Sequence, residues 1–266
     1  MQARSLLFDL WGDYIQHVGG EAWTSTLARY LAEFGINEPN LRQALSRMTR
    51  QGWLQVRKVA SRSCYSLTDQ GKKRMAEACR RVYDPVDAPW DGQWRMLCYS
   101  IPESMRAIRD DLRKELAWTG LAPLTPGTWI SPNPLEEAIA ELVARYEIDQ
   151  YVTTFGAGLT GAGTPRDLVA RCWDLGGIQS GYDQFIARWA PRLASPGLPG
   201  DVECFVTRIE LVHDYRKFLF VDPGLPRELL PEQWRGHDAR RLFQEYYAYL
   251  DAGARRFMDA AFEPTR

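Results

Sequence analysis

The sequence contains few of the residues that build metal sites and disulfide frameworks. Its 266 residues include only three histidines, at positions 17, 213 and 237, and five cysteines. The cysteines are scattered and odd in number, and no two of them form a CxxC pair, so neither a zinc site nor a set of disulfide bonds is indicated. We expect most of them to be small buried thiols.

Recognisable catalytic motifs are also missing. The sequence has no GxSxG, no Walker phosphate loop, no GxGxxG after a predicted strand and no HExxH. Its one glycine cluster, GAGLTGAG at residues 156–163, follows a predicted strand, but no apolar helix opens directly from it. We therefore interpret this cluster as a flexible loop and not as a phosphate cradle. These absences argue against an enzyme.

No stretch of the sequence is apolar over the roughly 20 residues that a membrane-spanning helix requires. The apolar residues 6–11 are interrupted by Asp9 and followed by Asp13, so they do not have the form of a secretory signal peptide. We therefore expect a cytoplasmic protein.

What the sequence does contain is a local concentration of positive charge. The whole chain has a formal net charge of −1, with 33 Lys and Arg and 34 Asp and Glu. Residues 40–81 alone carry 11 basic side chains against two acidic ones, Asp69 and Glu77. A basic block inside a nearly neutral chain predicts a polyanionic partner for one domain only.

Residues 1–83 are predicted to form a domain of three helices followed by a hairpin. The apolar spacing predicts helices over 3–18, 24–34 and 37–51 and strands over 53–59 and 63–67. Asn37 can cap the third helix, because its side chain accepts hydrogen bonds at helix starts. Pro39 is tolerated in the first turn of that helix, where its missing N–H has no intrahelical partner.

The third predicted helix has an apolar face and a polar face. Its apolar positions are Leu41, Ala44, Leu45 and Met48. The opposite face carries side chains of the types that hydrogen-bond base edges and phosphates, namely Asn40, Arg42, Gln43, Ser46, Arg47 and Arg50. The hairpin adds three cations near its tip, Arg57, Lys58 and Arg62. This order of elements predicts a winged helix-turn-helix, with the third helix in the major groove of DNA.

Residues 92–164 are predicted to form a second domain, after a linker over 81–91 that contains two prolines and three aspartates. The patterns predict strands over 94–101, 121–124, 128–131 and 151–155 and helices over 104–118 and 135–146. The resulting order β-α-β-β-α-β is ferredoxin-like. Some such domains are metal-dependent nucleases, but the first strand here ends in Tyr-Ser-Ile-Pro without an aspartate, which argues against hydrolysis.

Residues 165–266 are predicted to be mostly helical, and their densest polar and aromatic segment is RIELVHDYRKFLFVDPGLP at 208–226. Three interpretations of this segment stay open: an interface with another domain or subunit, an anion-binding group, or an acid/base set. The anion-binding candidates are Arg208, Tyr215 and Arg216. The acid/base candidates are His213, Asp214 and Tyr215. Adjacent residues of one helix face different directions, which disfavours the acid/base interpretation.

Seven blocks of the sequence, in order, resemble the PaaX family of transcriptional regulators. They are SLLFDLWGDYI, LRQALSRMTRQGWL, YSLTDQGKKRM, WDGQWRMLCYSIPE, LRKELAWTGLAPLTPGTWISP, LVARCWDL and RIELVHDYRKFLFVDPGLPRELLP. The resemblance extends from about Ser5 to Leu250 and is much more specific than a generic winged helix.

The resemblance implies an α+β multidomain fold. It has an N-terminal winged helix-turn-helix (1–83), a central ferredoxin-like, Cas2-like domain (92–164) and a mostly helical PaaX-type C-terminal domain (165–266). It also implies a homodimer that represses a phenylacetate-type catabolic operon by binding palindromic operator DNA, and that is released by phenylacetyl-CoA or a related acyl-CoA. No cofactor and no metal is implied. The alternatives are a related regulator of another pathway with another effector, or an enzyme acting on a CoA thioester or a nucleic acid.

Applied to this chain, the resemblance makes residues 37–51 the recognition helix. Arg42, Arg47 and Arg50 are then phosphate or guanine contacts, and Gln43 is a candidate base reader. A CoA-ester pocket should offer cations for the CoA phosphates and an apolar slot for the acyl group. The candidates for that pocket are Arg208, Tyr215, Arg216 and Trp129.

Overall fold

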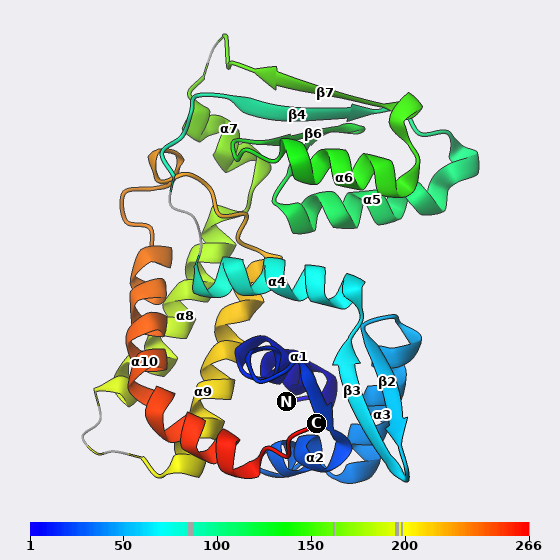
Figure 1. Cartoon of the computed structure of the whole chain (residues 1–266). Coiled ribbons are helices and arrows are strands. Elements are labelled where there is room, and N and C mark those ends of the chain that lie inside the picture. Colours follow the sequence, from blue (N-terminus) through cyan, green and yellow to red (C-terminus); the bar gives the residue numbers. More distant parts are fainter. Residues whose placement is uncertain (85–87, 162, 195–196, 198, 266) are drawn as a thin grey trace. The chain divides into compact units, whose positions relative to one another are not determined.

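The computed structural model describes residues 1–84, 88–161, 163–194, 197 and 199–265 (Figure 1). The chain divides into two compact units, each assembled from separate stretches of sequence. Unit 1 combines 1–84, 184–217 and 237–266, and unit 2 combines 85–183 and 218–236. Within the described ranges, no helix has the length and apolar character needed to cross a membrane.

Unit 1 contains the elements that the sequence predicts for residues 1–67, with shifted ends. They are α1 (Ala3–Asp13), α2 (Thr24–Ala32), α3 (Glu38–Arg50), β2 (Leu54–Val59) and β3 (Arg62–Leu67). The structure adds a short 3-10 helix, η1 (Ile15–His17), and a strand, β1 (Glu21–Trp23), that the sequence analysis missed. The strands form an antiparallel sheet in the order β1-β3-β2. A two-residue turn joins β2 to β3, and Ala60 in that turn has a positive φ of 51°.

The start and the buried face of α3 follow the prediction. The side chain of Asn37 accepts a hydrogen bond of 3.0 Å from the backbone N–H of Asn40, which satisfies one of the free donors of the first turn. Pro39 lies in that turn. The four predicted apolar residues of α3 are buried. Their burial fixes which face of the helix is left exposed.

A further helix, α4 (Asp69–Tyr83), follows the hairpin and was not predicted. The Thr68 side chain caps it by accepting a 3.0 Å hydrogen bond from the backbone N–H of Gly71. A Cβ atom at Gly71 would lie only 2.5 Å from the carbonyl oxygen of Trp53, so the glycine permits a close approach between α4 and the residue before β2. Residues 85–87 of the predicted linker lie outside the described residues.

The first helix is buried on nearly all sides, whereas the sequence suggested one apolar face. Leu6, Leu7, Leu10 and Trp11 have no exposed surface, and Asp9 and Asp13 on the polar side are buried too. The polar side is covered by α9 (Asp201–Tyr215), which packs along α1 within unit 1 (Figure 1). The last long helix, α10 (Gly236–Ala261), completes the unit together with part of α8 (Leu175–Leu193).

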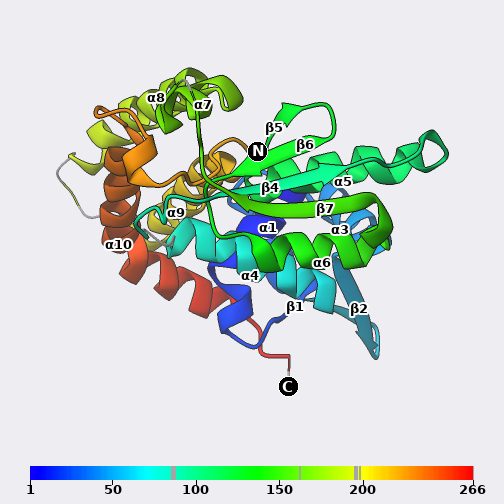
Figure 2. The same ribbon diagram turned by 90° about the horizontal axis from the view of Figure 1, so that it is seen from above.

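Unit 2 has the predicted β-α-β-β-α-β order. Its elements are β4 (Trp94–Tyr99), α5 (Arg106–Thr119), β5 (Ala122–Thr125), β6 (Thr128–Ser131), α6 (Glu136–Tyr146) and β7 (Val152–Ala157). The strands form one sheet in the order β5-β6-β4-β7, and every neighbouring pair is antiparallel (Figure 2). This strand order is that of the ferredoxin-like fold, so the prediction for the central region is confirmed.

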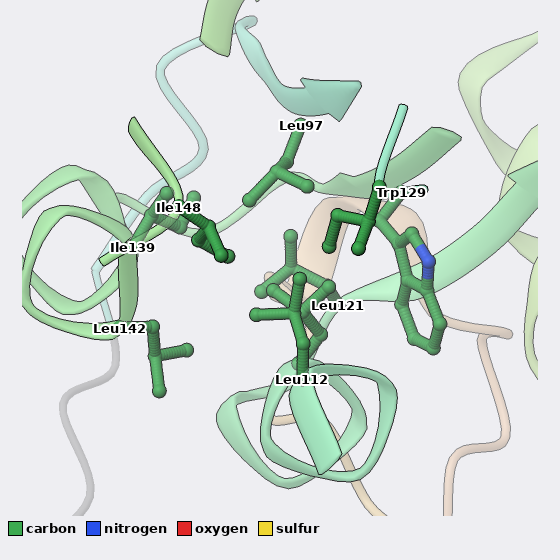
Figure 3. Close-up of a cluster of buried hydrophobic side chains, with 9 residues drawn as sticks. Leu97, Leu112, Leu121, Trp129, Ile139, Leu142 and Ile148 are labelled. Atoms are coloured by element: carbon green, nitrogen blue, oxygen red, sulfur yellow. The ribbon is translucent and has the colours of Figure 1, made fainter. Parts of the chain in front are cut away.

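The core of unit 2 lies between the sheet and its two helices, which cover the same face (Figure 1). Leu97 and Trp129 come from the strands and pack against Leu112, Leu116, Ile139 and Leu142 from α5 and α6 (Figure 3). Gly127 makes the β5–β6 turn, with φ of 82°, and a Cβ atom there would lie 2.8 Å from the Tyr99 carbonyl oxygen. After β7 the chain continues into α7 (Pro165–Cys172), whose start is closed by a capping box between Thr164 and Asp167.

The helical prediction for the last third of the chain is also confirmed, since α7, α8, α9 and α10 account for most of it. The division into three domains of contiguous sequence stays a prediction. The compact units divide the helical third between them, because residues 184–217 and 237–266 join the N-terminal elements. The residues of one compact unit are therefore those that pack together in space, and they are not contiguous in the sequence.

Candidate nucleic-acid interface

The polar face of α3 is fully presented to solvent. All six predicted contact residues, Asn40, Arg42, Gln43, Ser46, Arg47 and Arg50, are exposed. The apolar face beneath them packs into unit 1, so these side chains are carried on a rigid element and not on a loop. A rigid helix with one polar, cationic face can contact base edges and phosphates without further folding.

The β2–β3 hairpin presents the second group of predicted contacts. Arg57, Lys58 and Arg62 are exposed on its two strands. Val59 of β2 lies opposite Arg62 of β3 at the turn, which places Arg62 at the start of the returning strand. The hairpin itself is held by the pairing of β3 with β1 on its other side. Its cations therefore occupy fixed positions relative to unit 1.

The cations of the two groups differ in their ionic partners. Arg47, Arg50 and Lys58 make no ion pair with any residue that the structure describes, whereas Arg42 pairs with Glu38 one helical turn earlier, at 2.9 Å. Arg57 pairs with Glu21 of β1 at 2.7 Å, and this hydrogen bond raises the pKa of the arginine above its ordinary value. Arg47 and Arg50 on α3 and Lys58 on the hairpin are thus the cations most available to a polyanion.

Arg62 is bound within unit 1 by residues from distant parts of the sequence. Its guanidinium hydrogen-bonds the Glu263 carboxylate, donates to the Ser25 hydroxyl at 3.0 Å and lies 4.3 Å above the Trp23 ring. Arg29 of α2 lies 3.8 Å from the same carboxylate. Arg29 and Glu263 were not predicted as site residues. No local pattern in the sequence marks them, because the ion pairs that they form join residues about 200 positions apart.

Arg208, a predicted anion contact, is instead part of a buried charged cluster. Its Nε and Nη2 atoms donate to the two oxygens of Asp13 at 2.8 and 3.2 Å, and Nη1 donates to Asp251. Nη2 also donates to the Tyr247 hydroxyl at 2.5 Å, and that hydroxyl donates to Asp13 at 2.7 Å. Burial is the largest single influence on the pKa of Arg208 and lowers it, but the contacts with Asp13, Tyr247 and Asp251 together outweigh burial, so the net pKa is raised. The guanidinium is therefore fully used inside the unit.

Residues at the end of α9 and directly after it make similar contacts. Arg216 hydrogen-bonds the buried Asp9, and His213 Nδ1 lies 2.9 Å from the other oxygen of that carboxylate. Tyr215 is buried, and its ring stacks on Phe243 at a centroid distance of 4.2 Å. These contacts join the segment to α1 and α10 within unit 1. The anion-binding role of Arg208, Tyr215 and Arg216 stays a prediction.

The remaining candidates do not converge with these residues. Asp214 faces another set of partners, with the Trp189 indole donating to it at 3.2 Å and Arg188 pairing with it at 2.7 Å. Trp129 belongs to the hydrophobic core of unit 2, where it is 5% exposed (Figure 3). In the part of the chain that the structure describes, no group of three or more His, Cys, Asp or Glu side chains is placed to hold a metal ion.

Comparison with known proteins assigns most of the chain to one family. Residues 2–71 match the model described as PaaX-like protein, residues 87–169 the PaaX protein central Cas2-like domain, and residues 173–260 the PaaX-like protein C-terminal domain. The exposed cationic helix and the ferredoxin-like unit lie within the first and second of these matches. The chain belongs to the PaaX family.

Two relatives illustrate the extent of the similarity. The transcriptional repressor PaaX of Escherichia coli is 33% identical over 263 residues, which cover 96% of this chain and 82% of that protein. A solved structure, the uncharacterized protein Rv0674 from Mycobacterium tuberculosis, is 27% identical and superposes with a TM-score of 0.62, covering 98% of each chain. The likeness therefore includes fold as well as sequence.

Proposed function

We propose that this chain is a transcriptional repressor that binds operator DNA through a winged helix-turn-helix made of α2, α3 and the β2–β3 hairpin. The observation that carries the proposal is the fully exposed polar face of α3, on which Arg47 and Arg50 have no ionic partner among the described residues. Membership of the PaaX family and the repressor function of the E. coli relative support it.

The geometry of α3 is suited to the major groove. Its 13 residues extend about 20 Å at 1.5 Å per residue, and the groove of B-DNA is wide enough to admit a helix. In this arrangement α3 reads the groove while the hairpin touches the adjoining backbone. We propose a cytoplasmic homodimer, which would present two such helices to a palindromic operator, because protein and operator then share the same two-fold symmetry.

We further propose that an acyl-CoA, with phenylacetyl-CoA as the first candidate, releases the operator. Such an effector shifts DNA affinity only if it binds the non-operator state more tightly. Arg208 and Arg216 are already paired with carboxylates of α1, so an anion bound by either would compete with Asp13 or Asp9. That competition would loosen α9 from the elements that bind DNA and supplies a physical route for the coupling.

The proposed function is tested by titrating the purified protein against the duplex upstream of its own gene and against a random duplex of equal length. Phenylacetyl-CoA, free phenylacetate and plain CoA are added in parallel. We expect tighter binding to the upstream duplex and its loss with the thioester only, by about 5- to 150-fold, the usual range of allosteric coupling. Binding that no compound changes would contradict the effector, and equal binding to both duplexes would contradict the specific repressor.

Arg47→Ala is expected to weaken binding to the upstream duplex by roughly 1–3 kcal/mol, the range for loss of a well-placed arginine contact. Arg113→Ala is the matched control, because Arg113 is an exposed arginine of α5 that makes no ion pair with a described residue. The two Kd values are measured by fluorescence anisotropy at one salt concentration. Equal losses in the two variants would show that only overall charge matters and that α3 is not the contact.

A further inference from the structure

A short segment after α10 lies against the elements that carry the hairpin cations. We call residues 262–265 the 262–265 segment. The Trp23 indole donates a 2.9 Å hydrogen bond to the carbonyl oxygen of Pro264, and the backbone N–H of Glu263 donates to the Thr26 hydroxyl at 3.2 Å. Phe262 meets the Tyr14 ring edge-on, with centroids 6.1 Å apart. The segment is thus fixed at three points, on β1, on α2 and on the residue that directly follows α1.

This attachment aims the Glu263 carboxylate at two arginines. Arg62 donates a hydrogen bond to one carboxylate oxygen, and Arg29 lies 3.8 Å from the other. The Arg62 hydrogen bond is the largest cause of a lowered pKa at Glu263, so the side chain is ionised at neutral pH. The three side chains are only partly covered, with 48%, 57% and 30% of Arg62, Arg29 and Glu263 exposed. The ion pair is therefore open to solvent and to a competing anion.

A carboxylate and a phosphate present the same kind of partner to a guanidinium, namely two anionic oxygens that accept charge-assisted hydrogen bonds. Arg62 begins the returning strand of the hairpin, and Arg29 belongs to α2, the helix that crosses the DNA backbone in a helix-turn-helix. The Glu263 carboxylate therefore lies where a backbone phosphate would have to lie in order to contact these two guanidinium groups. The same guanidinium groups cannot be fully engaged by both anions at once.

We propose that Glu263 is an intramolecular competitor of a DNA phosphate at Arg62 and Arg29, and that the 262–265 segment thereby limits the affinity of the hairpin for DNA. This inference rests on the proposed DNA-binding function. The two groups of cations then differ. Arg47 and Arg50 of α3 are always available to DNA, whereas Arg62 of the hairpin becomes available only when Glu263 releases it. Because the segment directly follows α10, any rearrangement of that helix alters the competition.

The proposal predicts a change in salt dependence as well as in affinity. Each cation that neutralises a phosphate releases counterions, and log K then falls with log salt by about 0.9 per contact. An arginine already neutralised by Glu263 contributes little to this release. Freeing the arginine from Glu263 makes the slope of log K against log salt steeper. A variant that merely disturbs folding does not make this slope steeper, because it adds no phosphate contact.

The test compares the full-length protein with Glu263→Gln, which keeps the size of the side chain and removes its charge. Binding to the upstream duplex and to a random duplex of equal length is measured over a series of salt concentrations. We expect Glu263→Gln to bind both duplexes about 2- to 5-fold more tightly at low salt, with a steeper slope by up to about 0.9, as one exposed ion pair is exchanged for one phosphate contact.

Two further variants isolate the contact. Glu245→Gln removes an equal charge from an exposed position of α10 that makes no ion pair with a described residue, and it should match the parent protein. Arg62→Gln combined with Glu263→Gln should lose most of the gain. Thermal unfolding of each variant shows whether it is folded.

The outcomes are distinct. Unchanged affinity and slope in folded Glu263→Gln, weaker binding, or an equal gain in Glu245→Gln would each overturn the competitor role while leaving the DNA-binding function intact. Failure of both the parent protein and Glu263→Gln to bind any duplex would overturn the proposed function itself, and the competitor role with it.

Discussion

Arg208→Met is expected to lower the free energy of unfolding of unit 1 by about 3–5 kcal/mol, the usual loss when one partner of a buried ion pair is removed. The Asp13 side chain has no exposed surface, so without the guanidinium its carboxylate keeps only hydroxyl donors, from Tyr247 at 2.7 Å and Tyr83 at 3.2 Å. Methionine fills similar space without charge. The change is measured by urea unfolding followed by circular dichroism.

Arg256→Met serves as the matched control. Arg256 also makes a two-pronged contact with an aspartate, Asp201, at 2.7 and 3.1 Å, but 64% and 43% of the two side chains are exposed. Exposed pairs of this kind contribute little to stability because solvent screens them, so a much smaller loss is expected. Adding Asp13→Asn to Arg208→Met should recover part of the loss, because the unpaired charge is then removed. Equal destabilisation by the two arginine variants would show that burial of the cluster is unimportant.

A fragment of residues 1–84 is expected not to fold by itself, although it contains every element of the proposed winged helix-turn-helix. In the structure, aromatic residues of this fragment are covered by helices from later in the chain. Phe205 of α9 packs on Tyr30 and Phe34, each at 5.6 Å between ring centroids. The Tyr30 hydroxyl donates to the carbonyl oxygen of Met258 at 2.8 Å. Exposure of these surfaces to water costs about 25 cal/mol for each Å² of apolar area.

The fragment is examined by circular dichroism and by the dispersion of its amide NMR signals. A fragment of residues 88–164 is the control, because the nine buried side chains of the cluster between the sheet and its two helices all come from residues 97–148. We expect cooperative unfolding and dispersed signals from 88–164 and neither from 1–84. A well-dispersed spectrum of 1–84 would show that α9 and α10 are dispensable for the DNA-binding elements.

Taken together, these two expectations assign α9 a structural role in the proposed repressor. Two buried carboxylates of α1, Asp9 and Asp13, pair with Arg216, which directly follows α9, and with Arg208 of α9. The first helix of unit 1 is therefore held by charged contacts from the last third of the chain. Such contacts are strong when complete and costly when broken. They therefore tie α1 firmly to the last third of the chain.

The elements that the sequence predicted well are those in which local pattern and local chemistry agree. The cap at Asn37, the apolar stripe of α3 and the order of strands and helices in residues 94–157 all depend on neighbours within one element or one supersecondary unit. Of the missed β1 and α4, only β1 lacked a local signal, because α4 has a side-chain cap at Thr68 and an amphipathic pattern. The three-residue β1 is fixed by its pairing with β3, opposite residues 64–66, and α4 is positioned by the contact of Gly71 with Trp53.

The candidate site shows the same division. Exposure of the cationic face of α3 follows from its helical period, so the sequence by itself determined which side chains meet solvent and that the chain resembles PaaX regulators. Only the tertiary structure decided which cations are already neutralised. Arg208 and Arg62 look alike in sequence, but one is buried against Asp13 and the other is paired with Glu263, because ion pairs depend on proximity in space and their partners lie about 200 residues away.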